Sequence, residues 1–275
     1  MGWLQALLLG LVQGLTEFLP VSSSGHLMIV KELLGVDAEG FLDFTVTVHL
    51  ATVLSTLVVF WKPICRLIAG LFKFNYNDET DYVFKLIVSM IPVALVGFLL
   101  KDKVEALFGD TLTTVAVCLL ITALLLILSD LFGSSARKEA HQPASAARNG
   151  INYWQAFVVG IGQAFAVAPG LSRSGTTIAT GLLCGVKREA MAQFSFLMVL
   201  VPIIGEQLLD VLKSVTGEAA LGGGLSPACL VAGFVAAFLS GLFACKAMVA
   251  LVKKAKLGWF ALYCLIVAVL IFIFA

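Results

Sequence analysis

Charged side chains are scarce in this sequence of 275 residues. They make up 13% of the chain, whereas 60% of it is hydrophobic and the mean hydropathy is +1.02. Such a composition excludes an ordinary soluble domain. The formal net charge is only +1, and the basic residues are scattered among the loops, which excludes a nucleic-acid-binding surface. The composition therefore predicts a polytopic membrane protein whose main surroundings are the lipid bilayer.

Several familiar sequence patterns are also missing. The six cysteines show no metal-ligand or disulfide spacing, and we interpret them as apolar filling. The N-terminus lacks the basic region and the small-residue cleavage site of a signal peptide, so its apolar run is expected to belong to the fold. The sequence has no Gly-x-x-x-x-Gly-Lys motif, which excludes a nucleotide-binding P-loop.

Long apolar runs dominate the chain. A bilayer core of about 30 Å needs roughly 20 helical residues to cross it, and six segments reach that length. Two further segments, 3–35 and 151–186, are interrupted by Pro, Gly and Ser and leave arms too short to span. Because such breaks persist in a membrane only where protein covers them or they face water, we expect an all-α protein with six transmembrane helices and two re-entrant helical hairpins. The predicted spans are 41–60, 83–100, 112–132, 190–212, 226–251 and 257–275.

The two interrupted segments match each other when the sequence is shifted by 150 residues. Gln5 falls on Gln155 and Gly10 on Gly160, for example. Each half then holds one hairpin and three spans, and an odd number of crossings inserts the second half upside down, as an inverted-topology repeat. We expect the two polar loops to meet near the membrane midplane. The single membrane domain 1–275 divides into a first repeat 1–132, a cytoplasmic linker 133–150 and a second repeat 151–275.

The basic residues are unequally distributed between the two sides of this topology. Eleven fall on one side and four on the other, which makes the first side cytoplasmic. Both termini and the entrance of the first hairpin then face away from the cytoplasm. The first group is Lys62, Arg66, Lys73, Arg137, Lys138, Arg148, Lys187, Arg188, Lys253, Lys254 and Lys256, and the second is Lys31, Lys101, Lys103 and Lys213.

Polar and ionisable residues surround the break in the first hairpin. A charged group at bilayer depth costs about 2.5 to 3.5 kcal/mol on insertion scales, so it is usually retained to pair with another charge or with a ligand. Gln13 and Glu17 stand four residues apart and share one helix face, where both can act on one ion or water. A helix that starts near Ser24 would direct free N–H groups and its positive dipole end at an anion. The polar run comprises Ser22, Ser23, Ser24, Gly25 and His26.

The second loop repeats this design and adds a guanidinium. Arg173 offers a planar fork of donors that matches phosphate oxygens, and glycines allow close approach of the backbone. Hydroxyl groups supply further donors. We therefore predict an anion clamp made of Ser172, Arg173, Ser174, Gly175 and Thr177.

Together the two loops hold the groups that phosphoryl transfer needs, because that reaction depends mainly on positioning and charge stabilisation. His26 follows Ser23 by three residues and is expected to take the proton of its hydroxyl. A water activated by His26 or by a metal ion is an equally allowed nucleophile. Glu17 is expected either to orient His26 or to hold a divalent cation.

Two long motifs, Gln13-Gly-Leu-Thr-Glu17-Phe-Leu-Pro-Val-Ser-Ser-Ser-Gly-His26 and Pro169-Gly-Leu-Ser-Arg173-Ser-Gly-Thr-Thr177, resemble the signature motifs of the undecaprenyl-pyrophosphate phosphatases, the bacitracin-resistance family. The resemblance covers essentially the whole chain. The family's first motif has Glu or Gln, three residues and then Glu. Here its first position is Gln13, which removes a potential anionic metal ligand where many relatives have Glu.

The resemblance implies a phosphatase of the bacterial inner membrane that removes one phosphate from the lipid carrier undecaprenyl pyrophosphate outside the cytoplasm and regenerates the carrier for cell-wall synthesis. It implies Glu17, Ser23, His26 and Arg173 as catalytic residues, with Mg²⁺ or Ca²⁺ as cofactor and Glu17 as a metal ligand. The substrate-binding set then contains Gln13, Ser22, Ser24, Gly25, Ser172, Ser174, Gly175 and Thr177.

Other interpretations of the sequence stay open at this point. Opposed hairpins in an inverted repeat also suit alternating access, so a transporter or flippase of a polyprenyl-phosphate lipid is the alternative function. Glu17 and Arg173 could be a purely structural pair. We interpret His49, inside the first span, as a structural core histidine. The sequence leaves open whether the protein forms a homodimer.

Overall fold

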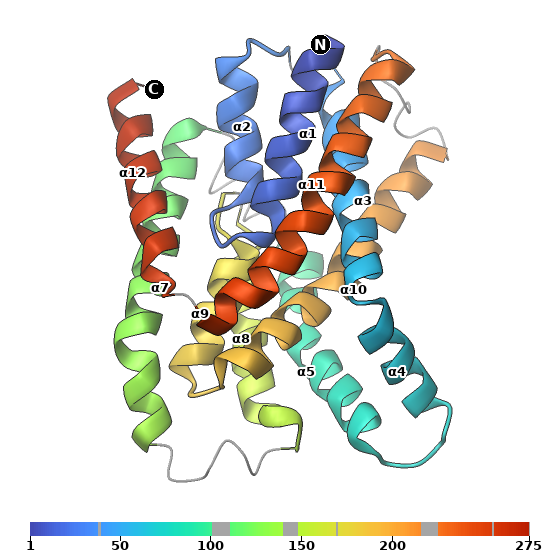
Figure 1. The fold of residues 1–275 in the computed structure, drawn as a ribbon, viewed down its shortest axis with the longest axis vertical. Coiled ribbons are helices and arrows are strands. Elements are labelled where there is room, and N and C mark those ends of the chain that lie inside the picture. Colours follow the sequence, from blue (N-terminus) through green and yellow to red (C-terminus); the bar gives the residue numbers. More distant parts are fainter. Residues whose placement is uncertain are drawn as a thin grey trace.

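The computed structural model describes residues 1–37, 40–100, 111–139, 148–168, 170–215, 225–254 and 256–274, and within these ranges the secondary structure is helical throughout (Figure 1). The expectation of an all-helical chain is confirmed. The elements are α1 (Trp3–Phe18), α2 (Ser23–Leu33), α3 (Phe41–Val59), α4 (Trp61–Leu71), α5 (Asp78–Leu99), α7 (Leu112–Glu139), the 3₁₀ turn η1 (Arg148–Gly150), α8 (Tyr153–Phe165), α9 (Arg173–Leu183), α10 (Arg188–Val215), α11 (Pro227–Lys254) and α12 (Gly258–Phe274).

Each of the six predicted spans coincides with one of these helices. Among the described residues, four helices are long and apolar enough to cross a bilayer: α5, α7, α10 and α11. Helix α3 joins them if it is counted together with α4, although the two are bent by 70°. Helix α12 is apolar but has only 17 residues. The helices therefore form a multi-pass membrane protein with four to five candidate spans by length and composition.

The bend between α3 and α4 has a local cause. Proline lacks a backbone N–H, so Pro63 cannot donate to the carbonyl of Val59 as a continuous helix would require. Proline is tolerated in the first turn of a helix, and Pro63 lies at the third position of α4. The sequence predicts no helix here, and Lys62, Arg66 and Lys73 are expected on the cytoplasmic side between the first two spans.

The first hairpin turns at a proline. Leu19 has extended backbone angles (φ −75°, ψ 146°), as expected for a residue before Pro20, and α1 ends at Phe18. Helix α2 then begins at an N-cap serine, because Ser22 Oγ accepts a hydrogen bond from the backbone N–H of Gly25 (3.3 Å). This short connection places the end of α1 against the start of α2.

The two helix pairs α1–α2 and α8–α9 share hydrogen bonds at positions 150 residues apart. Gln5 Nε2 donates to the carbonyl of Leu34 (3.0 Å), and Gln155 Nε2 donates to the carbonyl of Cys184 (2.9 Å). In each pair, the same glutamine also accepts a backbone N–H at the first turn of its helix. The correspondence seen in the sequence therefore extends to specific contacts.

The two halves of the chain interlock. Helix α1 of the first half packs along α11 of the second, α8 of the second half packs along α5 of the first, and α7 lies beside α12 (Figure 1). Small residues make the first two contacts close. A Cβ added to Gly10 would lie 2.3 Å from the carbonyl oxygen of Gly233, and one added to Gly160 would lie 2.2 Å from that of Ser89.

Helix α7 continues to Glu139, inside the range predicted as the linker 133–150.

Candidate active site

Glu17 stands in the last turn of α1 and joins both sides of the first hairpin. Its Oε2 accepts hydrogen bonds from Ser23 Oγ (2.6 Å) and from Gln13 Nε2 (2.8 Å). The carboxylate is mostly buried, with 10% of the side chain exposed. The predicted pairing of Gln13 and Glu17 on one helix face therefore occurs, and the nearby hydroxyl of Ser23, the first residue of α2, contacts the same oxygen.

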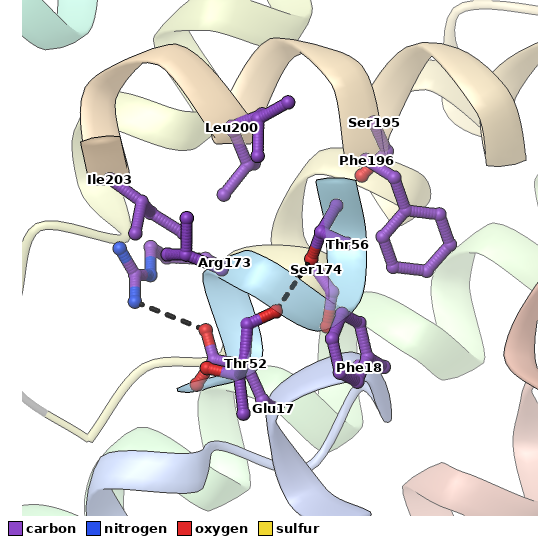
Figure 2. A pocket seen from close by; sticks show the side chains of 12 residues that line it. Glu17, Phe18, Thr52, Thr56, Arg173, Ser174, Ser195, Phe196, Leu200 and Ile203 are labelled. Carbon is purple, nitrogen blue, oxygen red and sulfur yellow. Dashed lines mark hydrogen bonds and ion pairs between the residues drawn. The ribbon is translucent and has the colours of Figure 1, made fainter. Parts of the chain in front are cut away.

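The second loop reaches this carboxylate with its guanidinium. Arg173 Nη2 lies 3.3 Å from Glu17 Oε1, and the two residues are 156 positions apart in the chain. Ser174 Oγ also donates to the carbonyl of Leu19 in the first loop (3.1 Å). Figure 2 shows the Arg173 side chain pointing toward Glu17. The structure thus brings the two polar loops together, as the repeat predicted.

His26 does not have the partner expected from the sequence. Its Nδ1 lies 2.7 Å from the carbonyl oxygen of Ser22, and its Nε2 lies 2.8 Å from the hydroxyl of Tyr263 on α12. Because a carbonyl oxygen only accepts, Nδ1 carries the hydrogen and Nε2 accepts from Tyr263. Neither ring nitrogen contacts Ser23 or Glu17. The expected Ser23–His26 contact is therefore wrong for this geometry, because the turn directs the Ser23 hydroxyl to Glu17.

His49 is a neighbour of the site that the sequence analysis assigned to the core. Its Nε2 lies 3.8 Å from Glu17 Oε2, and its Nδ1 bonds the carbonyl oxygen of Thr45 (2.8 Å). The spacing of Thr45, His49, Thr52 and Thr56 places these polar groups on one face of an otherwise apolar helix. That polar face is the signal that could have identified His49. Tyr263 had no comparable signal, because it meets His26 across 237 residues.

A pocket opens beside the Glu17–Arg173 pair, between α3 and α10 (Figure 2). One part of its wall is polar and includes the ion pair, Ser174 and Ser195. The remaining wall is apolar and contains Val53, Val199, Leu200 and Ile203. The wall thus combines charge with hydrocarbon, as a ligand with a charged head and a hydrocarbon tail requires, while Ser23 and His26 are not among its lining residues.

Several of the other predicted binding residues serve the loop backbone. Ser22 and Ser172 are buried N-caps, and their hydroxyl oxygens accept the N–H groups of Gly25 (3.3 Å) and Gly175 (3.1 Å). Thr177 is fully buried; its hydroxyl donates to backbone carbonyls and lies 2.6 Å from Ser195 Oγ. Ser24 is exposed, with its hydroxyl 3.5 Å from that of Ser22.

The two helix starts still offer backbone donors. Since the serine caps occupy the N–H groups of Gly25 and Gly175, the N–H groups of the two preceding residues in each helix have no partner within the described chain. The positive dipole ends of α2 and α9 therefore adjoin the Arg173 guanidinium, an arrangement that favours an anion. The free donors belong to Ser23, Ser24, Arg173 and Ser174.

A divalent cation would find oxygen ligands in this site. The amide oxygen Oε1 of Gln13 is buried and has no hydrogen-bond partner among the described residues, and the amide nitrogen of the same side chain donates to the Glu17 carboxylate (2.8 Å). The described residues contain no cluster of three or more His, Cys, Asp or Glu side chains that could hold a metal. One carboxylate and one amide oxygen fit Mg²⁺ or Ca²⁺ when phosphate and water complete the ligand set.

Residues 6–270 match the family described as bacitracin resistance protein BacA. The chain is 52% identical over 269 residues to an undecaprenyl-diphosphatase of Bacteroides fragilis, covering 98% of this chain and 97% of the relative. It is 53% identical over 266 residues to an undecaprenyl-diphosphatase of Parabacteroides distasonis, covering 97% and 96%. An undecaprenyl-diphosphatase of Methanosphaera stadtmanae is 36% identical over 282 residues, covering 97% and 96%.

Proposed function

The chain belongs to the bacitracin resistance protein BacA family, and we propose that it is a membrane phosphatase that hydrolyses undecaprenyl pyrophosphate to undecaprenyl phosphate and inorganic phosphate. This activity recycles the lipid carrier for cell-wall synthesis and gives resistance to bacitracin. The observation that carries the proposal is the convergence of Ser23 and Arg173, from different halves of the chain, on the Glu17 carboxylate. The undecaprenyl-diphosphatase names of the relatives specify the substrate.

The cationic part of the site binds the pyrophosphate. Arg173 supplies a fork of donors, and the free N–H groups at the starts of α2 and α9 add fixed dipoles. These groups stabilise the negative charge that spreads over the transferred phosphoryl group, and their positions are set before the reaction begins. In this arrangement Arg173 exchanges part of its contact with Glu17 for the phosphate oxygens.

The nucleophile stands on the acidic side of the site. Ser23 Oγ attacks the terminal phosphorus, its proton passes to Glu17 Oε2, which it already contacts at 2.6 Å, and the bond to the bridging oxygen breaks with lipid phosphate as the leaving group. Water then hydrolyses the phosphoserine and releases inorganic phosphate. Direct attack by water, with Glu17 accepting its proton, is the alternative course for the same residues.

A divalent cation belongs to this proposal. Glu17 and the buried Oε1 of Gln13 would hold Mg²⁺ or Ca²⁺, and the bound ion would neutralise part of the phosphate charge. The buried Oε1 of the equivalent Gln163 is also unpaired among the described residues, so the nearby Glu17 carboxylate is what distinguishes the first half as the cation site.

The apolar wall of the pocket receives the start of the polyprenyl tail. Val53, Leu200 and Ile203 are largely buried and line the same cavity as the ion pair. Hydrocarbon next to these side chains leaves water at low energetic cost, whereas the charged head requires the polar wall. The pocket therefore suits a substrate that stays partly in the lipid phase.

We propose the following membrane arrangement. Six helices span the bilayer, α1–α2 and α8–α9 are re-entrant hairpins, and the second half is an inverted copy of the first. The positive-inside rule supports cytoplasmic placement of η1, with both termini and the pocket opening outside the plasma membrane. The paired hydrogen bonds of Gln5 and Gln155 support the repeat.

Phosphate release from undecaprenyl pyrophosphate by the purified protein in detergent tests the function. We expect release that depends on protein concentration and stops when divalent ions are chelated. Detergent removes the two compartments that transport needs, so a transporter or flippase would release no phosphate there. Absence of release from folded protein with added Mg²⁺ and Ca²⁺ would contradict the phosphatase, and movement of intact lipid in vesicles would then favour the transporter.

A further inference from the structure

Ser22 holds the first loop in an unusual backbone conformation. Its φ is +69°, in a region that non-glycine residues rarely adopt and that stays populated only when the surroundings enforce it. The next residue is Ser23, whose hydroxyl contacts Glu17. Whatever fixes the backbone of Ser22 therefore also fixes the direction of the Ser23 side chain.

His26 holds the carbonyl group of Ser22. Its Nδ1–H donates to the carbonyl oxygen of Ser22 (2.7 Å), which also accepts the backbone N–H of His26 (3.2 Å). The imidazole is itself held from the far side, because Tyr263 donates to Nε2 (2.8 Å) and its ring stacks on the imidazole with 5.5 Å between ring centres. The residue after Tyr263 touches the same loop, since Cys264 Sγ lies 3.7 Å from the carbonyl oxygen of Pro20.

The second loop makes the same bond with a different residue, at a serine whose φ is an ordinary −70°, so the bond holds the carbonyl and does not itself impose the positive φ of Ser22. Thr176, 150 positions after His26, donates from Oγ1 to the carbonyl oxygen of Ser172 (2.8 Å), the residue equivalent to Ser22. A threonine hydroxyl cannot serve as an acid or base near neutral pH. The bond to this carbonyl is therefore part of the loop scaffold in both halves, and the first half uses an imidazole to make it.

We propose that Tyr263 and His26 form a positioning pair, in which Tyr263 holds the imidazole so that its Nδ1–H fixes the Ser22 carbonyl and thereby aims the Ser23 hydroxyl at Glu17 and the phosphorus. His26 acts through the loop in this arrangement and exchanges no proton with Ser23. Tyr263 is a further residue of the reaction, contributed by the C-terminal helix α12. The inference rests on the proposed phosphatase activity.

Substitution of His26 by Thr or Val tests the role of the imidazole. The two replacements have the same shape, but only threonine retains a donor for the Ser22 carbonyl, as Thr176 does in the second loop. We expect kcat for phosphate release to be about 10-fold higher in His26→Thr than in His26→Val, with similar thermal unfolding temperatures in detergent. Equal and near-complete loss of kcat in both variants would overturn the proposal, because the imidazole itself would then be required.

Tyr263→Phe tests the other half of the pair. The ring remains and only the hydroxyl is lost, so we expect kcat to fall about 3- to 10-fold with little change in KM, as for the loss of one hydrogen bond. The same substitution in the His26→Thr background should have no effect on kcat, because threonine has no Nε2 to receive the bond. Equal effects in both backgrounds, or no effect in the wild type, would contradict the coupling.

Phosphate release by the wild-type protein distinguishes a failure of the positioning pair from a failure of the proposed phosphatase activity. If the wild type releases phosphate and the variants behave otherwise than described, only the positioning pair is wrong. If the wild type releases none, the proposed function fails first. Val58→Ala, on the exposed side of α3 and away from the loops, serves as the control and should keep wild-type kcat.

Discussion

The helix starts at Ser22 and Ser172 share a set of hydrogen bonds but differ in chemistry and in backbone, since φ is +69° at Ser22 and −70° at Ser172. In each loop the serine caps the start of a helix, because its hydroxyl oxygen accepts the backbone N–H of the glycine three residues later. In each loop the carbonyl of that serine also bonds the side chain four residues further on. Where the first loop has Glu17 and Ser23, however, the second has Val167 and Arg173. Neither half holds a complete set of groups for phosphoryl transfer.

This difference explains why the halves interlock. An acid and a nucleophile on one loop need a cation for the phosphate, and only the other loop provides it. The close packing of α1 on α11 and of α8 on α5 ties each loop to the opposite half. The hydrogen bonds that the two loops share hold both loops rigid. The few positions at which the loops differ place the acid on one loop and the cation on the other.

Removing the acid of the first loop should have the largest effect. Glu17→Gln keeps the size of the side chain but loses the carboxylate that accepts the Ser23 hydroxyl and pairs with Arg173. We expect kcat for phosphate release to fall by about 10² to 10⁴, the range for loss of a general base. Glu79→Gln, which removes a carboxylate paired with the exposed Arg66 far from the pocket, is the matched control. A Glu17→Gln enzyme within tenfold of wild type would show that the first loop does not provide the base.

Removing the cation of the second loop should cause the second-largest loss of activity. Arg173→Ala leaves the phosphate without its fork of donors, and loss of one such stabilising group typically costs about 10² to 10³ in rate. Arg173→Lys keeps the charge without the fork and should recover only part of the loss. Steady-state kinetics measure both variants, with Arg66→Ala as the control for loss of an exposed arginine. Full activity of Arg173→Lys would mean that charge alone suffices.

The sequence predicted the parts of this comparison that depend on local patterns. Hydropathy located the six helical ranges, and the 150-residue shift paired the two loops with their charged residues. Hydropathy is a property of single short segments, and the repeat is a match between two such segments. Both can therefore be detected without knowledge of the tertiary packing. Helix α4 was not predicted because its 11 residues, with Lys62 and Arg66 among them, do not form an apolar run long enough to cross a bilayer.

Contacts between distant segments could not be predicted in the same way. The partner of His26 is Tyr263, on the last helix, and its sequence position says nothing about where that helix packs. His26 and Ser23 are neighbours in sequence, yet the turn geometry at Ser22 directs their side chains to different partners. His49 showed a polar helix face, but only the packing of α3 beside α1 reveals that this face meets Glu17.

Disturbing the close contacts of α1 with α11 and of α8 with α5 should lower the stability of the protein moderately, by a similar amount in both halves. Alanine at Gly10 would place a Cβ 2.3 Å from the carbonyl oxygen of Gly233, and alanine at Gly160 would place one 2.2 Å from that of Ser89. Overpacking of this kind typically costs about 1 to 3 kcal/mol, measurable as a lower midpoint of denaturant unfolding in detergent. Gly97→Ala, with open space around the new Cβ, should be neutral or slightly stabilising. Unchanged stability in both interface variants would contradict the close contact.

The smallest effect should come from the paired glutamines that brace each hairpin. Gln5→Ala and Gln155→Ala each remove a bond from the side-chain amide to a backbone carbonyl, that of Leu34 in the first half and of Cys184 in the second. Each also loses the bond that the amide oxygen accepts from a backbone N–H, but that bond is exposed and water replaces it. We expect each to lower the free energy of unfolding by about 0.5 to 1.5 kcal/mol, the net value of such a bond. Because the two bonds lie in separate helix pairs, the double variant should show the sum of the single losses. A loss confined to one half would mean that the two hairpins, although built alike, do not contribute equally to stability.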